Sequence, residues 1–536
     1  MKRKLSIFLI FVMSIMLFSS CNEIDEELTF TVLFTDINAK IAWGNDEISK
    51  EIKRRTGVNL EIEVINTDTT SKIDKMIKQD NLPDMIFSVD NDIISELANK
   101  NLLYSIDEYI TPDTNIYKIF GDDLKYMSSE TDGKIYGVNR QYKGVTSYSD
   151  ATFFIQYAVL EYFNYPDLNN LTLDDYYNML DEYKKEFKYI NNEETIGLSC
   201  WGDSYGMNIS INNPALRSGG YENDGFYVVN DNLDVEYGLK TDEANNFLLF
   251  LNKMYNNDLF DKDAIVQDRA QFYEKVTSGA VLSVMTESWD LADSESALRA
   301  NGLSDRCYMP VPIKQTEDTD LTNISNYDDK GTWKSVITKS CKNPEKAFKF
   351  FDTMWSDDMQ ILVNWGIEGI HYDIVEGKKQ IKQSVIDEVL YNPDWKSDTG
   401  LTIYCMWGYG SEVLDKNNEY YNYFTSIEFS SKCVDQETKE IMEIYNIDSF
   451  KDLCPPPKIA PHTYVWKLNL DKNSPGAVAE TYVNDILRRI YIPKLVFAES
   501  LTEFNTTWQT FMDEIDSTNI NLREQEIRNK LLLELE

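Results

Sequence analysis

The sequence predicts an α/β fold that is divided into two or more lobes. Strand and helix patterns alternate from Thr29 to Val89, which indicates βαβ units and a parallel sheet. The chain has 536 residues, and a single hydrophobic core stops growing at about 250–300 residues. Hydrophobic residues make up 42% of the chain and aromatic residues 13%, which is enough apolar surface for packed cores.

Five elements at the start of the folded chain can be assigned from local patterns. β-branched and aromatic residues predict a strand, and alternation of apolar with polar residues predicts a half-buried strand. Gly57 suits the C-terminal cap of a helix that begins near Asn45. The predicted elements are, in order, a strand at Thr29–Phe34, a helix from Asn45 to Gly57, a strand at Val58–Val64, a helix at Ser71–Asp80 and a strand at Met85–Val89.

The rest of the chain contains further predicted helices and strands. Asn343-Pro344 opens a helix with proline at the tolerated first position, and the apolar residues that follow at helical spacing predict one buried face. A buried strand is predicted at Ala280–Met285. Helices are predicted over Asp174–Lys184, Asp242–Tyr255 and Thr481–Phe511.

The N-terminus has the pattern of a secretory signal. Lys2, Arg3 and Lys4 precede an apolar run from Leu5 to Phe18, and Ser19, Ser20 and Cys21 follow it. The run is short for a membrane span and ends in small residues. The cysteine after the small pair resembles a bacterial lipobox, although Phe18 stands where that pattern prefers leucine. We expect a signal peptide at residues 1–20 and a lipidated tether at 21–27, so that Cys21 anchors the protein to a membrane. An ordinary secretory signal, with Cys21 incidental, is the alternative.

Charge and cysteine spacing exclude several classes of protein. Removal of residues 1–20 takes away three of the 52 basic residues and none of the 90 acidic ones, which leaves a net charge of 49 − 90 = −41. Such a surface repels nucleic acid and anionic headgroups, so we expect no nucleic-acid partner. Six cysteines follow Cys21 without a Cys-x-x-Cys pair, which excludes a small disulfide scaffold and a zinc ribbon.

Four segments in order carry a resemblance to a known family. They are Glu51–Glu61 (EIKRRTGVNLE), Leu82-Pro83-Asp84, Asp132–Gly137 (DGKIYG) and Ile337–Asp373. Behind a lipobox, their order and spacing resemble the extracellular solute-binding proteins of ABC importers, in the large lipoprotein branch associated with oligosaccharide uptake in Gram-positive bacteria. The resemblance runs from Phe30 to about Ile374 and continues more loosely through Tyr482–Trp508. Residues 148–242 do not align.

The resemblance implies a type II clamshell of the periplasmic-binding-protein kind, with two lobes that are each a sheet flanked by helices. The ligand, an oligosaccharide, would bind in the cleft at the hinge, and the closed form would dock on the membrane permease. We expect lobe 1 at residues 28–145 plus 304–341 and lobe 2 at 146–303 plus 342–536. The crossings are placed near residues 142–148, 303–312 and 340–344. A monomer without cofactor or metal is expected.

A sugar site needs carboxylates or amides for hydroxyl groups and aromatic rings for the C–H faces. Trp43, with Asn45 beside it, follows the first strand, at the end of the sheet where α/β ligands bind. Trp289 and Glu287 follow the strand Ala280–Met285, and in sugar-binding members of the family an aromatic residue at the corresponding place stacks on the sugar. Trp201 is its analogue after another short strand. Each of these residues has packing or capping as its alternative role.

Five further candidates come from two other segments. Tyr136 and Arg140 follow a predicted turn at Asp132-Gly133, and Arg140 would pair either with a ligand or with an acidic side chain of the protein. Glu368, His371 and Tyr372 lie in a glycine-rich and aromatic segment after a helix that ends near Val363. Glycines there let the backbone turn sharply, and the segment resembles a family signature near the hinge.

Enzymatic activity is not expected. His371 and His462 are the only histidines, and neither a Gly-x-Ser-x-Gly elbow nor a His-Glu-x-x-His motif occurs. A secreted glycosidase would need two facing carboxylates, and pairs such as Glu287 with Glu368 are no evidence among 90 acidic residues. A peptide-binding importer component is the other alternative, because a fold resemblance alone does not fix the ligand.

Overall fold

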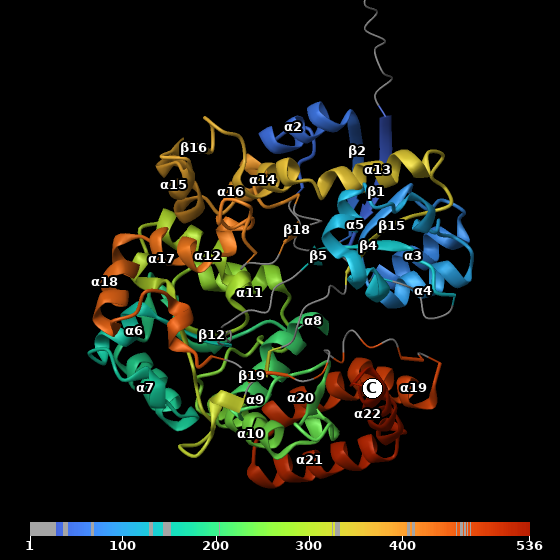
Figure 1. Cartoon of the computed structure of the whole chain (residues 1–536). Coiled ribbons are helices and arrows are strands. Elements are labelled where there is room, and N and C mark those ends of the chain that lie inside the picture. The colour runs from blue at the N-terminus through green and yellow to red at the C-terminus, as the bar shows by residue number, and fades with distance from the viewer. Residues whose placement is uncertain are drawn as a thin grey trace, which may run out of the picture.

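The structure is a computed structural model. It describes residues 28–35, 41–65, 69–127, 132–142, 152–202, 204–323, 325–326, 333–404, 408–409, 413–456, 458–460, 462, 465, 468, 470–471 and 473–535. The predicted signal peptide, Cys21 and the tether lie outside the described residues. Two sheets with helices around them form two lobes (Figure 1).

The first lobe is built on a five-stranded sheet. Its strands lie in the order β2 (Val58–Val64), β1 (Leu28–Phe34), β3 (Met85–Val89), β15 (Lys334–Ile337) and β4 (Gly137–Asn139). β1 runs parallel to both β2 and β3, whereas β15 runs antiparallel to β3 and β4. The predicted parallel βαβ units are therefore confirmed for the first three strands, and two antiparallel strands complete a mixed sheet.

Helices cover both faces of this sheet, because successive side chains of its strands point to opposite faces and both faces are apolar. Leu33, Ile86 and Val336 pack under α3 (Thr69–Lys78) and α4 (Asn91–Asn99). The opposite face meets α2 (Glu47–Thr56) and α5 (Asn115–Phe120). Local signals set the ends of α2, since the Asp46 side chain caps the Ser49 N–H and Gly57 takes φ 68° after the last turn.

The second lobe is built on a four-stranded sheet. Its strands lie in the order β13 (Tyr308–Val311), β6 (Phe153–Gln156), β12 (Val281–Met285) and β9 (Ile196–Ser199). β12 is parallel to β9 and antiparallel to β6. The helices around it are α6 (Tyr157–Tyr162), α7 (Leu173–Glu186), α10 (Asp242–Asn256), α11 (Arg269–Thr277) and α12 (Ser288–Ala300). All five residues of β12 are buried, as its apolar run predicts.

The hydrophobic cores divide the chain differently from the predicted lobes. α13 (Pro344–Met354) and α14 (Asp357–Trp365) were expected in the second lobe but pack in the first. The Phe351 ring meets Phe87 of β3 at 5.9 Å, and Trp355 meets Phe120 at 5.1 Å. Figure 1 shows α13 beside β1 and β2, and α14 continuing from α13 toward α2. The spacing of apolar residues in α13 reveals a buried face but not which sheet it covers.

The second crossing also differs from its expected place. Residues 304–313 were assigned to the first lobe, yet β13 pairs with β6, and Met309, Val311 and Ile313 belong to the second core. The chain returns to the first lobe before Trp333. The last passage falls after Phe429, which packs against the first core, and before Ile441 of the second.

The C-terminal helices complete the second lobe, in agreement with their predicted place. They are α18 (Gln436–Tyr445), α19 (Pro475–Tyr482), a π-helical turn at Val483–Leu487, α20 (Arg488–Val496), α21 (Leu501–Asp516) and α22 (Ile520–Leu535). The buried faces of these helices pack in the second core through Ile441, Ile492, Phe504 and Ile527.

Shorter elements connect these parts. In the first lobe they are β5 (Gln141–Tyr142) paired with β18 (Gly408–Tyr409), the hairpin of β16 (Tyr372–Val375) and β17 (Lys378–Ile381), α15 (Gln383–Tyr391), α16 (Trp395–Thr399) and α17 (Ile427–Lys432). In the second they are β7 (Tyr189–Ile190) with β8 (Glu193–Glu194), α8 (Ser204–Met207), a π-helical turn at Asn208–Asn212, α9 (Asn213–Ser218), and β10 (Tyr227–Val229) with β11 (Val235–Tyr237). β14 (Ser325–Asn326) pairs with β19 (Lys458–Ile459). Among the described helices, none combines the length and the hydrophobicity needed to cross a membrane.

Phe351→Ala tests the assignment of α13 to the first core. The fully buried ring leaves a cavity against Phe87, so the free energy of unfolding falls by about 3–5 kcal/mol. Urea unfolding of the fragment that begins at Asn22 measures the change. Tyr117→Ala, at a position 42% exposed in α5 of the same lobe, is the matched control and changes stability little. A loss for Phe351→Ala no larger than the control's would contradict the packing.

Candidate functional site

The carboxyl ends of the two sheets flank the segments that join the lobes. On the first lobe, the Arg140 N–H donates to the Trp333 carbonyl oxygen at 2.6 Å, so two of the crossings leave the first sheet side by side. On the second lobe, the chain re-enters at Thr152, whose carbonyl oxygen accepts from the Thr286 N–H at 3.2 Å, directly after β12. The candidate site is assembled from the side chains at these two edges.

Glu287 is the centre of a polar cluster at the second-lobe edge. Its carboxylate is buried and accepts a hydrogen bond from Asn213 Nδ2 at 2.6 Å. Arg217 Nη1 lies 3.3 Å from Glu287 Oε1, and Arg217 Nη2 lies 3.1 Å from Glu222 Oε1. One guanidinium therefore bridges two carboxylates, which holds all three groups in fixed positions.

Side-chain amides extend the cluster away from Glu287. Asn223 Nδ2 donates to Asn213 Oδ1 at 2.7 Å and to Asn208 Oδ1 at 3.1 Å, and Asn212 Nδ2 reaches Asn208 Oδ1 at 3.3 Å. Asn208 and Asn212 bound a π-helical turn, a form that often occurs at functional sites. These residues were not predicted, because they lie within 148–242, where the sequence shows no clear resemblance to the family. The run of asparagines was nevertheless a visible signal.

Trp289 offers an aromatic surface at the same edge. It lies in the first turn of α12, two residues after Glu287, and is 45% exposed. Its predicted position after β12 is confirmed. An exposed ring lies two positions along the chain from a carboxylate that a guanidinium and an amide hold, so this edge has both an aromatic face and polar groups.

Trp201 has a different environment from the one expected for a stacking residue. It is 1% exposed and packs in the second core, and its Nε1 donates to Asp290 Oδ2 at 2.9 Å. Asp290 also accepts from Arg269 Nε at 2.5 Å and from Thr286 Oγ1 at 2.7 Å. Trp201 is thus a buried support that joins the ends of β9 and β12, because its indole N–H satisfies a buried carboxylate.

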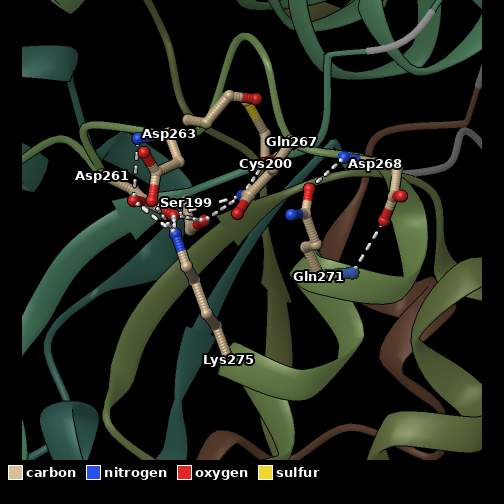
Figure 2. Close-up of polar contacts among 9 residues, drawn as sticks. Ser199, Cys200, Asp261, Asp263, Gln267, Asp268, Gln271 and Lys275 are labelled. Atoms are coloured by element: carbon tan, nitrogen blue, oxygen red, sulfur yellow. Dashed lines mark hydrogen bonds and ion pairs between the residues drawn. The ribbon is translucent and has the colours of Figure 1, made fainter.

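A second network of polar side chains holds the carboxyl end of β9 in place (Figure 2). Asp261 Oδ2 accepts from Ser199 Oγ at 2.6 Å, and Gln267 Nε2 donates to the Cys200 carbonyl oxygen at 2.5 Å. Lys275 Nζ lies 2.8 Å from Asp261 and 3.0 Å from Asp263. Burial opposes the charge on Lys275, but its hydrogen bonds to the two carboxylates outweigh burial and raise its pKa above the usual 10.5.

The first-lobe edge carries two cations. Arg140 Nη1 donates to Ser88 Oγ at 3.0 Å, at the carboxyl end of β3 where Ser88 has φ 65°. Lys334 is buried and its Nζ donates to Asn91 Oδ1, and burial lowers its pKa to about 8. Arg140 thus lies at the carboxyl edge of the first sheet, beside the crossings. Lys334 was not singled out, because a single lysine before a short strand has no distinctive pattern.

Tyr136 is turned toward its own segment. Its hydroxyl donates to Asp132 Oδ2 at 2.7 Å, and its ring packs against the core under α3 and α4. Burial and the Asp132 carboxylate raise the Tyr136 pKa to about 12. The ring therefore has a packing role in this structure.

Trp43 and Asn45 lie away from the carboxyl edges. Trp43 Nε1 donates to Asn59 Oδ1 at 3.2 Å, near the amino end of β2, and its ring packs on Tyr404 at 5.3 Å. The expected position of Trp43 at the ligand end of the sheet is therefore wrong. Asn45 is exposed next to Asp46, the N-cap of α2.

Glu368, His371 and Tyr372 lie at the same amino side. His371 is buried, accepts the Ile367 N–H on Nδ1 at 3.0 Å and lies 3.8 Å from Glu47 of α2; burial lowers its pKa. Tyr372 packs on Trp365 at 6.0 Å, and Glu368 is exposed. The structure does not bring these three residues together with Glu287 and Trp289. Within the described ranges, no group of three or more His, Cys, Asp or Glu residues could hold a metal ion.

Lys275→Met tests the support under the second-lobe edge. The variant leaves Asp261 buried without its cation, so the free energy of unfolding falls by about 3 kcal/mol at pH 7. Because the Lys275 pKa is raised on folding, its contribution is present below the usual value of 10.5 and is lost as pH rises above it. Urea unfolding from pH 7 to pH 11 measures the difference. Lys262→Met, at a lysine 73% exposed, is the control and has a small effect at every pH. A difference between Lys275→Met and wild type that does not shrink at high pH would contradict the ion pair.

Comparison with known proteins adds relatives of this fold. The chain is 28% identical over 132 residues to an uncharacterized protein in the butB 5′ region of Niallia circulans and 23% identical over 216 residues to the lipoprotein LipO of Bacillus subtilis. The matches cover 25% and 38% of this chain and 50% and 41% of those relatives.

Solved structures share the architecture over nearly the whole chain. The alginate-binding protein AlgQ2 matches with a TM-score of 0.64 at 16% identity, over 95% of this chain and 98% of that one. The FusA substrate-binding protein of S. pneumoniae, solved with kestose, matches with a TM-score of 0.63 at 17% identity, over 94% and 98%. The N-glycan transport protein NgtS of Streptococcus pneumoniae with Man5GlcNAc gives 0.52 at 14%, over 95% and 98%. The bacterial extracellular solute-binding protein model matches residues 47–365, more than half of the sequence. With its two-lobed fold, the chain belongs to the family of bacterial extracellular solute-binding proteins.

Proposed function

We propose that this protein is the substrate-binding component of an ABC importer and that it captures an oligosaccharide between its lobes. The observation that carries the proposal is the cluster of Glu287, Arg217 and Asn213 together with the exposed ring of Trp289, two residues after Glu287 in the chain. Carboxylate and amide groups pair with sugar hydroxyls, and an indole face covers sugar C–H groups. The saccharide-binding relatives named above support the same class of ligand.

The two edges give the ligand something to bind on each lobe. Arg140 and the exposed Trp333 border the crossings on the first lobe, and Trp289 and Glu287 lie on the second. A ligand that contacts both edges stabilises the closed form by the difference between its affinities for the closed and open states. The closed form is then the one that delivers the sugar to the permease.

The protein performs no covalent chemistry in this proposal. A glycosidase needs two carboxyl groups on either side of one bond, about 5–10 Å apart. Glu287 and Glu368 lie in different lobes, and Glu368 is at the amino side of its sheet. Glu287 is engaged by Arg217 and Asn213 as a hydrogen-bond acceptor, which suits recognition of a hydroxyl group.

The protein works on the extracellular face of the cell membrane as a monomer anchored by lipid on Cys21. The lipobox pattern at residues 18–21 supports this, as does the similarity to the lipoprotein LipO. Cleavage after Ser20 would leave the folded chain attached through the short tether 21–27.

Trp289→Ala tests the aromatic surface. A thermal-shift screen of the fragment that begins at Asn22, against oligosaccharides and short peptides, first selects a saccharide that raises the melting temperature. Calorimetry with that saccharide then gives an affinity weakened by about 1–3 kcal/mol in Trp289→Ala, because a buried stacking surface is lost. Tyr189→Ala, at an aromatic residue 70% exposed in β7, leaves the affinity unchanged. Unchanged affinity in Trp289→Ala would remove that ring from the site, and a hit only among peptides would replace the sugar by a peptide.

Cys21→Ala tests the anchor. Without the acceptor cysteine no lipid is attached, so the protein moves from the membrane fraction to the medium. Fractionation with immunodetection measures the distribution, and Cys454→Ala, at a partly buried cysteine of the folded part, is the control that stays with the membrane. Full membrane retention of Cys21→Ala would contradict the lipid anchor.

A further inference from the structure

One arginine at the second-lobe edge is held by two carboxylates of the protein itself. Arg217 Nη2 lies 3.1 Å from Glu222 Oε1, and Arg217 Nε donates to Glu222 Oε2 at 3.3 Å. Arg217 Nη1 donates to the two oxygens of Glu287, at 3.3 Å and 3.4 Å. All three nitrogen atoms of the guanidinium group are therefore engaged.

The contact with Glu222 is bidentate. The neighbouring N–H groups on Nε and Nη2 of Arg217 face the two oxygens of one carboxylate, which is the geometry by which arginine recognises carboxylate groups. A uronic acid unit of a saccharide would present the same chemical group. Glu222 thus takes the place on Arg217 that an acidic sugar would need.

Burial makes this internal pair difficult to replace. The side chain of Arg217 is 16% exposed, and those of Glu222 and Glu287 are 8% exposed. A ligand carboxylate that displaced Glu222 would leave this glutamate shielded from water without its cation, which is strongly unfavourable. Arg217 therefore remains paired with the protein when a ligand binds.

The surrounding residues add negative charge to the second-lobe edge. Residues 213–224, 268–269 and 286–293 contain two basic and six acidic side chains, so their formal charge is 2 − 6 = −4. Arg269 is itself paired, because its Nε lies 2.5 Å from Asp290 Oδ1. An anionic sugar meets like charge at this edge, whereas a hydroxyl or an ammonium group does not. The eight side chains are Arg217, Glu222, Asp224, Asp268, Arg269, Glu287, Asp290 and Asp293.

The described residues of the first-lobe edge carry no surplus of positive charge. Arg140 and Lys334 lie there, but residues 88–92 contain two aspartates, so the formal charge of this set is zero. Lys334 is buried and its Nζ donates to Asn91 Oδ1, and Arg140 Nη1 donates to Ser88 Oγ at 3.0 Å. Taken together, the two edges favour a ligand without acidic groups.

The other groups at the second-lobe edge suit uncharged and amino sugars. Asn213 and Asn223 bring side-chain amides to the cluster, with Asn223 Nδ2 at 2.7 Å from Asn213 Oδ1, and amides pair with hydroxyl groups. The 45% exposed ring of Trp289 offers a face for sugar C–H groups or for an ammonium group. Neither kind of contact requires a negative charge on the ligand.

We propose that Glu222 occupies Arg217 in place of a ligand carboxylate, so that the protein selects neutral or amino oligosaccharides and rejects those built from uronic acids. This rests on the proposed function, because it concerns the saccharide captured at this edge. Glu222 acts as a specificity-determining residue through Arg217, without itself needing to touch the ligand.

Matched saccharides test the selection in the fragment that begins at Asn22, which keeps every described residue. β-1,4-linked mannotetraose and tetramannuronate differ only in a hydroxymethyl group that is replaced by a carboxylate. Cellotetraose and the chitosan tetramer differ only in a hydroxyl that is replaced by an ammonium group. Thermal shift and calorimetry compare each pair within the wider panel of saccharides and peptides. The saccharides that bind are expected to be neutral or amino sugars, with acidic counterparts at least about tenfold weaker.

Glu222→Gln tests the residue that is responsible. The variant removes the negative charge that fills the bidentate face of Arg217, so an acidic saccharide is expected to gain about tenfold in affinity relative to its neutral counterpart. Glu182→Gln, at an exposed glutamate of α7, removes the same charge elsewhere on the second lobe and leaves that ratio unchanged. The melting temperature without ligand reports whether each variant folds, and the comparison of matched saccharides in the wild type decides the selection if Glu222→Gln does not.

Tighter binding of an acidic saccharide than of its neutral counterpart by the wild type would overturn the selection and leave the capture of oligosaccharides intact. No gain for Glu222→Gln, or an equal gain for Glu182→Gln, would overturn the role of Glu222. Hits confined to peptides, or the absence of any hit in the panel, would contradict the proposed function itself.

Discussion

The first lobe depends on a strand that arrives late in the chain. β15 lies between β3 and β4, antiparallel to both, so the five-stranded sheet is completed by a strand that follows the second-lobe strands in the chain. The chain must therefore leave after β5, form the second sheet and return before Trp333. This single pairing puts two crossings side by side at Arg140 and explains why the carboxyl edges of both sheets border the segments that join the lobes. α13 and α14 follow β15 directly, and they pack on the sheet that it completes.

The second-lobe edge is held in place by buried polar groups that satisfy one another. Asp290 joins Trp201, Arg269 and Thr286, and Asp261 joins Ser199, Gln267 and Lys275. A buried carboxylate is costly unless it is paired and hydrogen-bonded, and here each has several donors. These networks fix the ends of β9 and β12, so the Glu287 cluster and Trp289 are presented on a rigid edge. A binding site that is ordered before its ligand arrives loses less free energy when the ligand binds.

Local patterns in the sequence were sufficient to predict most individual strands and helices. Met85–Val89 and Val58–Val64 form strands with the predicted bounds, because apolar runs and alternation are properties of neighbouring residues. Gly57 ends α2 as expected, because this cap depends on the left-handed conformation of a single residue, which glycine adopts readily. Position along the chain after β12 was also enough to place Glu287 and Trp289 at a carboxyl edge.

Features that depend on distant contacts were harder to predict. The apolar face of α13 does not say which sheet it covers. Trp43 follows β1 in sequence, but its indole reaches Asn59 at the amino end of β2. Trp201 and Trp289 both follow strands, but the Trp201 indole is buried and bonded to Asp290, whereas Trp289 is 45% exposed. Arg217 belongs to the cluster through Glu287, a residue far along the chain, and one sequence carries no signal for that contact.

The most direct test of this account is hydrogen exchange, measured by mass spectrometry, on the fragment that begins at Asn22, with and without a saturating oligosaccharide that raises its melting temperature. A ligand bound between the lobes slows exchange at both carboxyl edges, in peptides that cover 286–290 and 333–337, and leaves the hairpin at 372–381 unchanged. Protection confined to one lobe, or protection at the hairpin without the two edges, would contradict a ligand site between the lobes.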